Sequence, residues 1–110
     1  MKVLIADDEI NIILLIKSLI DRQKTDVEIA GEAGDGITAL EMVRQLKPDV
    51  VITDIRMPGM NGMDLIRHVR EEQIPVEFVI ISGYSEFEYA RSAIQYGVSD
   101  YLLKPIKKDE

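Results

Sequence analysis

Strand and helix patterns alternate along this chain of 110 residues, and the alternation limits the folds open to it. Strand patterns occur at residues 2–6, 26–33, 50–53, 77–82 and 99–104. Patterns with helical spacing lie between them, at residues 10–23, 36–46, 63–73 and 86–97. Regular alternation of this kind predicts an α/β fold, in which a parallel sheet carries helices on both faces.

Five strands are too few to close an eightfold barrel, so an open, doubly wound sheet remains. Residues 50–53 and 77–82 are apolar on both faces, which predicts central strands. Residues 26–33 instead alternate, with Val27 and Ile29 set against Glu28 and Glu32, which predicts a strand near an edge. Residues 105–110 read as the start of a fifth helix, which we expect to be truncated.

Composition excludes several classes of function for this segment. Its net charge of −7 argues against direct binding of nucleic acid, which needs clustered Lys and Arg. The absence of Cys excludes disulfides and thiolate metal sites, and it fits a cytoplasmic protein. The sequence holds no apolar run of transmembrane length and its start does not resemble a signal peptide, so we expect no membrane association.

Polar residues follow four of the predicted strands, at the point where each strand ends. Asp7 and Asp8 follow the first strand, Asp54 the third, Ser82 closes the fourth and Lys104 the fifth. Ligands of open α/β sheets bind beyond the carboxyl ends of the strands. These carboxylates, the hydroxyl and the ammonium group are therefore expected to meet at one rim of the sheet.

Carboxylates on neighbouring strand tips repel one another unless a cation lies between them. Mg²⁺ prefers carboxylate, carbonyl and water oxygens, and the absence of His and Cys from the site disfavours zinc and copper. An aspartate beside Mg²⁺, a lysine and a hydroxyl is a plausible phosphoryl acceptor, because phosphoryl transfer needs mainly positioning and charge neutralisation.

With these residues in place, the chain resembles the receiver domains of two-component response regulators. The resemblance covers essentially the whole chain and rests on Asp7-Asp8, "DIRMPGMNG" from Asp54, Ser82-Gly83 after "VII", Tyr101, and Lys104-Pro105. It implies a flavodoxin-like sheet with strand order 2-1-3-4-5, and a domain over residues 1–110. It also implies a signal-receiving domain that is not an enzyme, except in catalysing its own phosphorylation and dephosphorylation.

The resemblance implies a role for each matching residue. Asp54 is the phosphoacceptor, and the donor is a phosphohistidine of a sensor histidine kinase or phosphotransfer protein. Mg²⁺, for which Mn²⁺ could substitute, is bound by Asp8, Asp54 and the backbone carbonyl of Arg56, with Asp7 acting through water. Ser82 and Lys104 contact phosphoryl oxygens. No organic cofactor is implied, and Met57, Pro58 and Gly62 shape the loop after the acceptor.

Other positions are implied to act in switching and in the lifetime of the phosphoryl group. Tyr101 turns inward when Ser82 moves, although a tyrosine there also fits a plain core position. The Lys104–Pro105 peptide is expected to be cis, which would aim Lys104 at the site. Arg56 and Tyr84 are large residues at the two lifetime-tuning positions, so we expect slow self-dephosphorylation.

The stretch from Ser82 to Ile106 further resembles receivers joined to AraC-type helix-turn-helix output domains. It implies that a DNA-binding output domain, absent from this chain, is attached in a longer transcription regulator. Receivers of this kind can form homodimers through their fourth helix and fifth strand, but the short fifth helix argues against a dimer here.

Three other functions are considered against these residues. A phosphatase of the haloacid dehalogenase type needs an aspartate two residues after its nucleophile, where this chain has Arg56. A flavodoxin-like redox carrier is disfavoured because Asp7 and Asp8 would repel a cofactor phosphate. A pseudo-receiver that is never phosphorylated stays open, although every key residue is present. The only histidine, His68, is expected at the surface with no role in the site.

Overall fold

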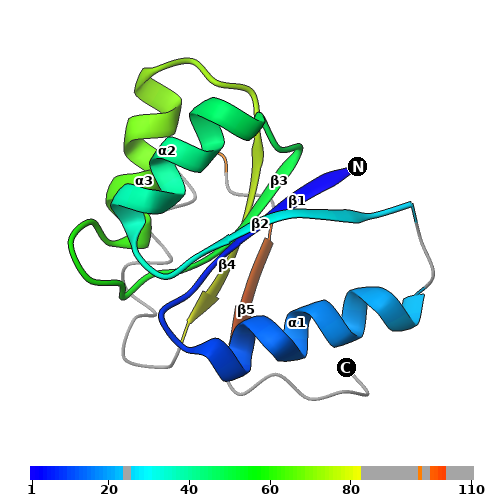
Figure 1. Ribbon diagram of the computed structural model, residues 1–110. Helices are drawn as coiled ribbons and strands as arrows, with labels where there is room; N and C mark the ends of the chain where they lie inside the picture. Colours follow the sequence, from blue (N-terminus) through cyan, green and yellow to red (C-terminus); the bar gives the residue numbers. More distant parts are fainter. Residues whose placement is uncertain (24–25, 83–96, 98–99, 104–110) are drawn as a thin grey trace.

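The computed structural model describes residues 1–23, 26–82, 97 and 100–103, with the backbone alone at residues 22, 23, 82 and 100–103. Strands and helices alternate in this part of the chain (Figure 1). The elements are β1 (Lys2–Ala6), α1 (Ile10–Gln23), β2 (Glu28–Ala33), α2 (Gly36–Leu46), β3 (Val50–Asp54), α3 (Gly62–Glu71), β4 (Glu77–Ser82) and β5 (Asp100–Leu103).

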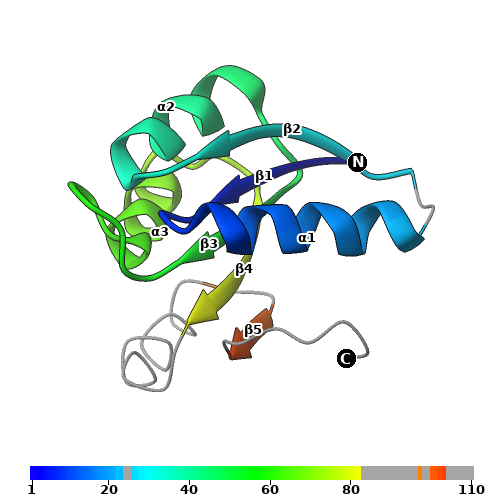
Figure 2. The same cartoon turned by 60° about the horizontal axis from the view of Figure 1, so that its bottom comes forward.

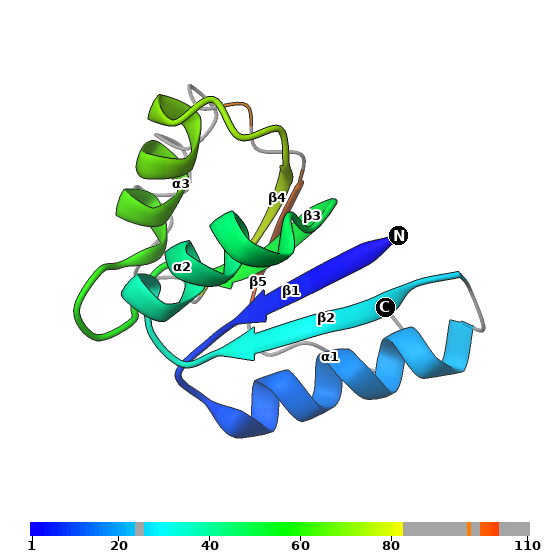
Figure 3. The ribbon, with the colours of Figure 1, turned by 45° about the horizontal axis from the view of Figure 1, so that its top comes forward.

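The strands form one parallel sheet with the order β2-β1-β3-β4-β5. The α/β class and the predicted order of the first four strands are therefore confirmed. α1 covers one face of the sheet, and α2 and α3 cover the other (Figures 2 and 3). β2 lies at an edge of the sheet, as predicted for the strand at residues 26–33.

Most predicted boundaries agree with the structure to within two residues. The second strand begins at Glu28 rather than at residue 26, and α3 begins at Gly62 and ends at Glu71 rather than spanning 63–73. The predicted helix at 86–97 and the start of a fifth helix lie outside the described residues. Gly97, the last residue of the helical pattern at 86–97, has a φ of 72°, a left-handed conformation that favours glycine.

The core lies on both faces of the sheet. On the α2 and α3 face, Leu4, Val51 and Phe78 are fully buried beneath the two helices. The opposite face is covered by Ile13 and Ile16 of α1. Burial on both faces explains why β1, β3 and β4 read as continuous apolar runs. The resulting rigid sheet fixes the positions of the residues at the strand ends.

The first helix packs against the sheet through much of the stripe that the sequence pattern predicts, which consists of Ile12, Leu15, Ile16, Leu19 and Ile20. Ile16 is buried, and Ile12 and Ile20 pack against the same cluster. Ile13 is also buried although it lies outside the predicted stripe, while Ile10 and Leu14 are 59% and 53% exposed. Nearly every position from 10 to 16 is apolar, so periodicity alone does not distinguish Ile13 from its exposed neighbours.

β2 contains a bulge that the sequence pattern does not reveal. Its register against β1 shifts between Val3, which pairs with Ile29, and Leu4, which pairs with Gly31. The extra residue reverses the alternation of side chains between the two faces. Ile29 consequently packs on the α1 face, and Ala33 packs on the face covered by α2.

This bulge corrects the prediction that Glu28 and Glu32 share one solvent-facing side of the strand. The two residues lie on opposite faces, because one precedes the bulge and the other follows it. Glu32 therefore faces α1, where the Lys17 ammonium donates to its carboxylate at 2.5 Å. This ion pair ties the edge strand to the helix.

A bidentate ion pair joins the ends of α2 and α3. Arg44 Nε and a terminal nitrogen donate to the two Glu72 carboxylate oxygens at 2.8 and 2.5 Å. The hydrogen bond from Arg44 lowers the pKa of Glu72 below its ordinary value of 4.5. A depressed carboxyl pKa stabilises the fold at pH values above 4.5, and this contribution disappears as the pH falls through the lowered value.

We expect Glu72→Gln to lower the urea midpoint of unfolding at neutral pH by a small amount, since the pair is half-exposed and screened by salt. The difference from wild type should vanish in acid, below the lowered pKa of Glu72, and shrink in high salt. Urea titrations across the acid range test this. A difference that stays constant with pH would contradict the assignment of the effect to the Glu72 charge.

Candidate functional site

Four acidic side chains meet at the carboxyl ends of β1 and β3. Asp7, Asp8, Glu9 and Asp54 each place a carboxylate oxygen within 4.8 Å of the others. β1 and β3 pair as neighbours up to Ala6, so the residues that follow reach the same rim of the sheet. The predicted convergence of Asp7, Asp8 and Asp54 is therefore present in the structure.

The cluster combines buried and exposed carboxylates. Asp7 and Asp54 are only 2% and 5% exposed, whereas Asp8 and Glu9 are exposed. Glu9 does not appear among the predicted ligands, although its place directly after Asp7-Asp8 was a signal for it. Acids that only begin a helix are normally solvated. In this cluster two of the four acids are buried and two are exposed, so the cluster is more than an ordinary helix start.

Backbone hydrogen bonds fix the two buried acids. The Ile55 amide donates to Asp54 Oδ1 at 2.7 Å, and Thr53 Oγ1 donates to the Asp54 carbonyl at 2.9 Å. The Glu9 amide donates to Asp7 Oδ1 at 2.9 Å. Each carboxylate thus has one oxygen held by a backbone amide, which orients the group.

The loop that follows Asp54 closes tightly before α3 begins. The Gly62 amide donates to the Ile55 carbonyl at 2.7 Å, and Asn61 caps α3 by accepting from the Asp64 amide at 2.8 Å. A Cβ at Gly62 would lie 2.0 Å from the Asp54 carbonyl oxygen, so only glycine allows this approach. Within the loop Met57 is buried in the core and Arg56 is exposed.

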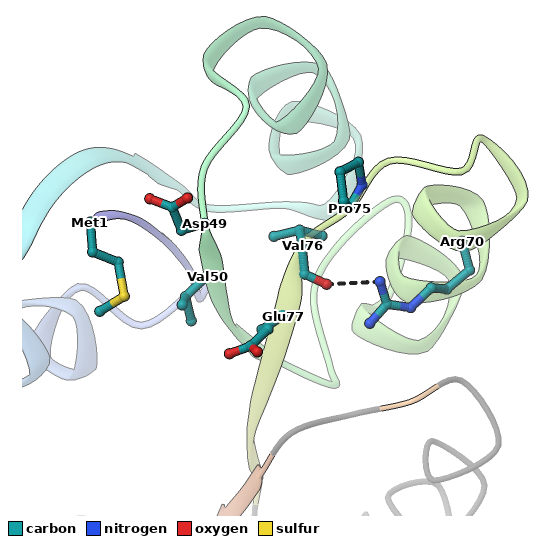
Figure 4. A pocket seen from close by; sticks show the side chains of 7 residues that line it. All are labelled: Met1, Asp49, Val50, Arg70, Pro75, Val76 and Glu77. Atoms are coloured by element: carbon teal, nitrogen blue, oxygen red, sulfur yellow. Dashed lines mark hydrogen bonds between the residues drawn. The ribbon is translucent and has the colours of Figure 1, made fainter.

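The larger of two cavities does not lie beside the acidic cluster. A cavity of 270 Å³ borders Asp7, Asp8 and Glu32. A larger cavity of 730 Å³ lies at the other end of the sheet, where β1, β3 and β4 begin, among Met1, Asp49 and Glu77 (Figure 4). There the polar groups already serve the fold: Arg70 donates to the Val76 carbonyl at 2.7 Å. We assign the candidate site to the end of the sheet beside the smaller cavity, because Asp7 and Asp8 line that cavity and also belong to the acidic cluster.

Comparison with known proteins places the chain in a family. The sequence profile of the response regulator receiver domain matches residues 3–110. The chain belongs to this family. Receiver domains are modules of response regulators rather than classical enzymes, which agrees with the prediction from the resemblance.

Receiver domains of known structure share both the sequence and the fold. The REC domain of AraT, a response regulator from Geobacillus stearothermophilus, is 42% identical, with a TM-score of 0.90 over 98% of this chain and 84% of that one. The receiver domain of the putative response regulator NarL from Mycobacterium tuberculosis is 32% identical, with a TM-score of 0.81 over 99% of this chain and 87% of that one.

Curated relatives of this receiver are transcriptional regulatory proteins by name. YesN of Bacillus subtilis is 40% identical over 99% of this chain and 30% of its own length. HptR of Staphylococcus aureus is 41% identical over 96% of this chain and 41% of its own. The chain therefore spans less than half the length of these relatives.

The donor set of this receiver fits a hard divalent cation. Carboxylate oxygens are the ligands that Mg²⁺ prefers, and the cluster contains neither His nor Cys. An acidic cluster of Asp7, Asp8 and Asp54 is typical of the Mg²⁺ site of receiver domains.

The remaining predicted site residues lie outside the described part of the receiver. They are the side chains of Ser82 and Tyr101, together with Tyr84, Lys104 and the Lys104–Pro105 peptide. The predicted surface position of His68 is only partly met, because its side chain is half-buried on α3. Among the described residues, no helix combines the length and apolarity needed to cross a bilayer.

Proposed function

We propose that Asp54 accepts a phosphoryl group from a phosphohistidine of a sensor histidine kinase or phosphotransfer protein. The observation that carries the proposal is the convergence of Asp54 with Asp7 and Asp8 within 4.8 Å at the rim of the sheet. Membership in the receiver family supports the same role.

Asp54 is held for attack on phosphorus. The Ile55 amide donates to Asp54 Oδ1 and orients the carboxylate, and in this proposal the other oxygen, Oδ2, acts as the nucleophile. It forms a bond to phosphorus as the bond from phosphorus to the donor imidazole nitrogen breaks. The leaving nitrogen keeps the electron pair, and Asp54 becomes an acyl phosphate.

The clustered carboxylates would repel an incoming phosphoryl group unless a cation neutralised them. In the proposal Asp8, Asp54 and the Arg56 carbonyl hold Mg²⁺ or Mn²⁺, and Asp7 contributes through water. The bound ion supplies charge neutralisation. Glu9 adds negative charge at the exposed side of the cluster.

Ser82 and Lys104 complete the proposed site from the neighbouring strands. Asp54 pairs with Ile81 of β4, so the backbone of Ser82 lies one residue beyond the acceptor. Ser82 in turn pairs with Leu103 of β5, directly before Lys104. This register supports hydrogen bonding of Ser82 and Lys104 to phosphoryl oxygens. In the proposal Tyr101, which belongs to the same strand β5, acts as the switch residue.

We further propose that the receiver, over residues 1–110, controls an attached DNA-binding output domain of AraC type in a longer cytoplasmic regulator. The longer relatives are transcriptional regulatory proteins by name, which supports this assignment.

The proposal includes a long-lived phosphoryl group, because Arg56 and Tyr84 would shield the acyl phosphate from water. Arg56 is exposed in the loop that follows Asp54. We expect Arg56→Ala with Tyr84→Ala to shorten the half-life of the phosphorylated domain. Decay of the phosphorylated species, followed by intact mass, measures this, and a wild-type half-life of seconds would contradict the expectation.

Small-donor phosphorylation tests the proposed function. With acetyl phosphate and Mg²⁺, wild type should gain the mass of one phosphoryl group, which alkali removes. Chelation of Mg²⁺ and Asp54→Asn should each abolish the gain. Asp49→Asn is the matched control, because Asp49 precedes the same strand at its other end. Equal labelling of wild type and Asp54→Asn would overturn the assignment.

A further inference from the structure

The loop of residues 55–61 connects the acceptor strand to α3 and carries Arg56, the proposed carbonyl ligand. Its two ends are joined by the hydrogen bond from the Gly62 amide to the Ile55 carbonyl. That bond fixes the ends of the loop but not its middle. The position of the Arg56 carbonyl therefore depends on what holds residues 56–60.

The middle of the loop packs against the first turn of α2, which lies beside it (Figure 3). A Cβ at Gly36 would lie 1.9 Å from the Met60 carbonyl oxygen, so backbone meets backbone at this point. The next residue, Ile37, covers Gly59, where a Cβ would be 3.3 Å from Ile37 Cδ1. Gly59 has a φ of 76°, so the turn of the loop lies under Ile37.

The first turn of α2 is itself well anchored. Asp35 caps the helix by accepting from the Thr38 amide at 2.7 Å and from the Thr38 hydroxyl at 2.9 Å. These hydrogen bonds lower the pKa of Asp35, because they stabilise its ionised form. The amino end of a helix carries a partial positive charge, which attracts carbonyl oxygens. The Met60 carbonyl oxygen lies beside Gly36 at this end of α2.

Ile37 has no evident role in the core, because its side chain is 53% exposed. An exposed isoleucine contributes little to stability by burial. Its packing over Gly59 thus acts mainly on the loop. Gly36 and Ile37 contact this loop directly, and the chain also connects them through Gly34 and Ala33 to Asp7, whose amide donates to the Ala33 carbonyl at 2.9 Å.

We propose that Gly36 and Ile37 are positioning residues, which hold the acceptor loop so that the Arg56 carbonyl faces the carboxylates, and which thereby set the affinity for the divalent cation. This inference rests on the proposed function. Loosening the loop is expected to weaken cation binding more than it weakens the fold.

Ile37→Ala tests the inference with little risk of unfolding. Mg²⁺ affinity of the full chain, measured by calorimetric titration, should fall several-fold, while the unfolding midpoint without Mg²⁺ stays near the wild-type value. Leu14→Ala is the matched control, since Leu14 is also 53% exposed but lies on α1, away from the loop. Equal affinity in Ile37→Ala and wild type would overturn the inference.

Gly36→Ala gives the stronger perturbation, because the added methyl must displace the Met60 backbone. We expect Mg²⁺ affinity to fall roughly tenfold or more. Val43→Ala, at a fully buried position on the same helix, provides a destabilised control that should keep its affinity. Equal losses in both variants would show that affinity only follows stability. If wild type itself bound no Mg²⁺, the proposed function would fail instead.

Discussion

Replacing Gly62 by alanine is expected to destabilise the receiver by about 3 kcal/mol or more, although alanine is the better helix former. Alanine normally stabilises a helix by about 1 kcal/mol relative to glycine. Here the new methyl group would lie 2.0 Å from the Asp54 carbonyl oxygen and 3.1 Å from Ile55 Cα. Both are backbone atoms of the acceptor strand and its loop, so the strand end must move. Steric overlap should outweigh helix propensity.

The matched control is Gly34→Ala, where an added Cβ would have no atom within 4 Å. That substitution should leave stability within about 0.5 kcal/mol of wild type, as most surface changes do. Urea unfolding measures both variants. Similar free energies of unfolding for Gly62→Ala and Gly34→Ala would contradict the close approach of α3 to the acceptor strand.

Mg²⁺ is expected to raise the thermal unfolding midpoint of wild type by on the order of 10 °C at saturating concentration. A ligand at a hundred times its dissociation constant stabilises the native state by about 2.7 kcal/mol. The effect arises because the cation, with Asp8 and Asp54 as its proposed ligands, offsets the repulsion among the four clustered acids of the folded state. The unfolded chain separates these acids and binds the ion less well.

Asp54→Asn and Asp8→Asn should each remove most of this shift, because each deletes a proposed ligand charge. Asp64→Asn is the matched control, since Asp64 lies on α3 and pairs with Arg67 at 3.3 Å rather than with the cluster. Scanning calorimetry with and without Mg²⁺ measures the shifts. A full Mg²⁺ effect in Asp54→Asn would place the cation elsewhere on the protein.

The sequence predicts the sheet well because its central strands are buried on both faces. A short apolar run such as residues 50–53 fits a strand that is buried on both faces, so the sequence predicts it as a central strand of the sheet. The convergence of Asp7, Asp8 and Asp54 also follows, since parallel strands end at one rim.

Other features depend on contacts that no local pattern contains. The bulge in β2, which places Glu28 and Glu32 on opposite faces, follows from pairing with β1. Ile13 of α1 is buried outside the predicted stripe, because its neighbours Ile12 and Leu14 are apolar as well and the pattern does not separate the three. The packing of Gly36 against Met60 joins residues far apart in the sequence, so it becomes visible only in the folded chain.

The central claim is that Asp54 carries the phosphoryl group. Phosphorylate the domain with acetyl phosphate and Mg²⁺, reduce the acyl phosphate with borohydride, and map the modified residue by peptide mass spectrometry. The account predicts homoserine at position 54 and unmodified Asp7 and Asp8. Reduction at Asp7 or Asp8, with Asp54 intact in protein that carries the phosphoryl group, would contradict it.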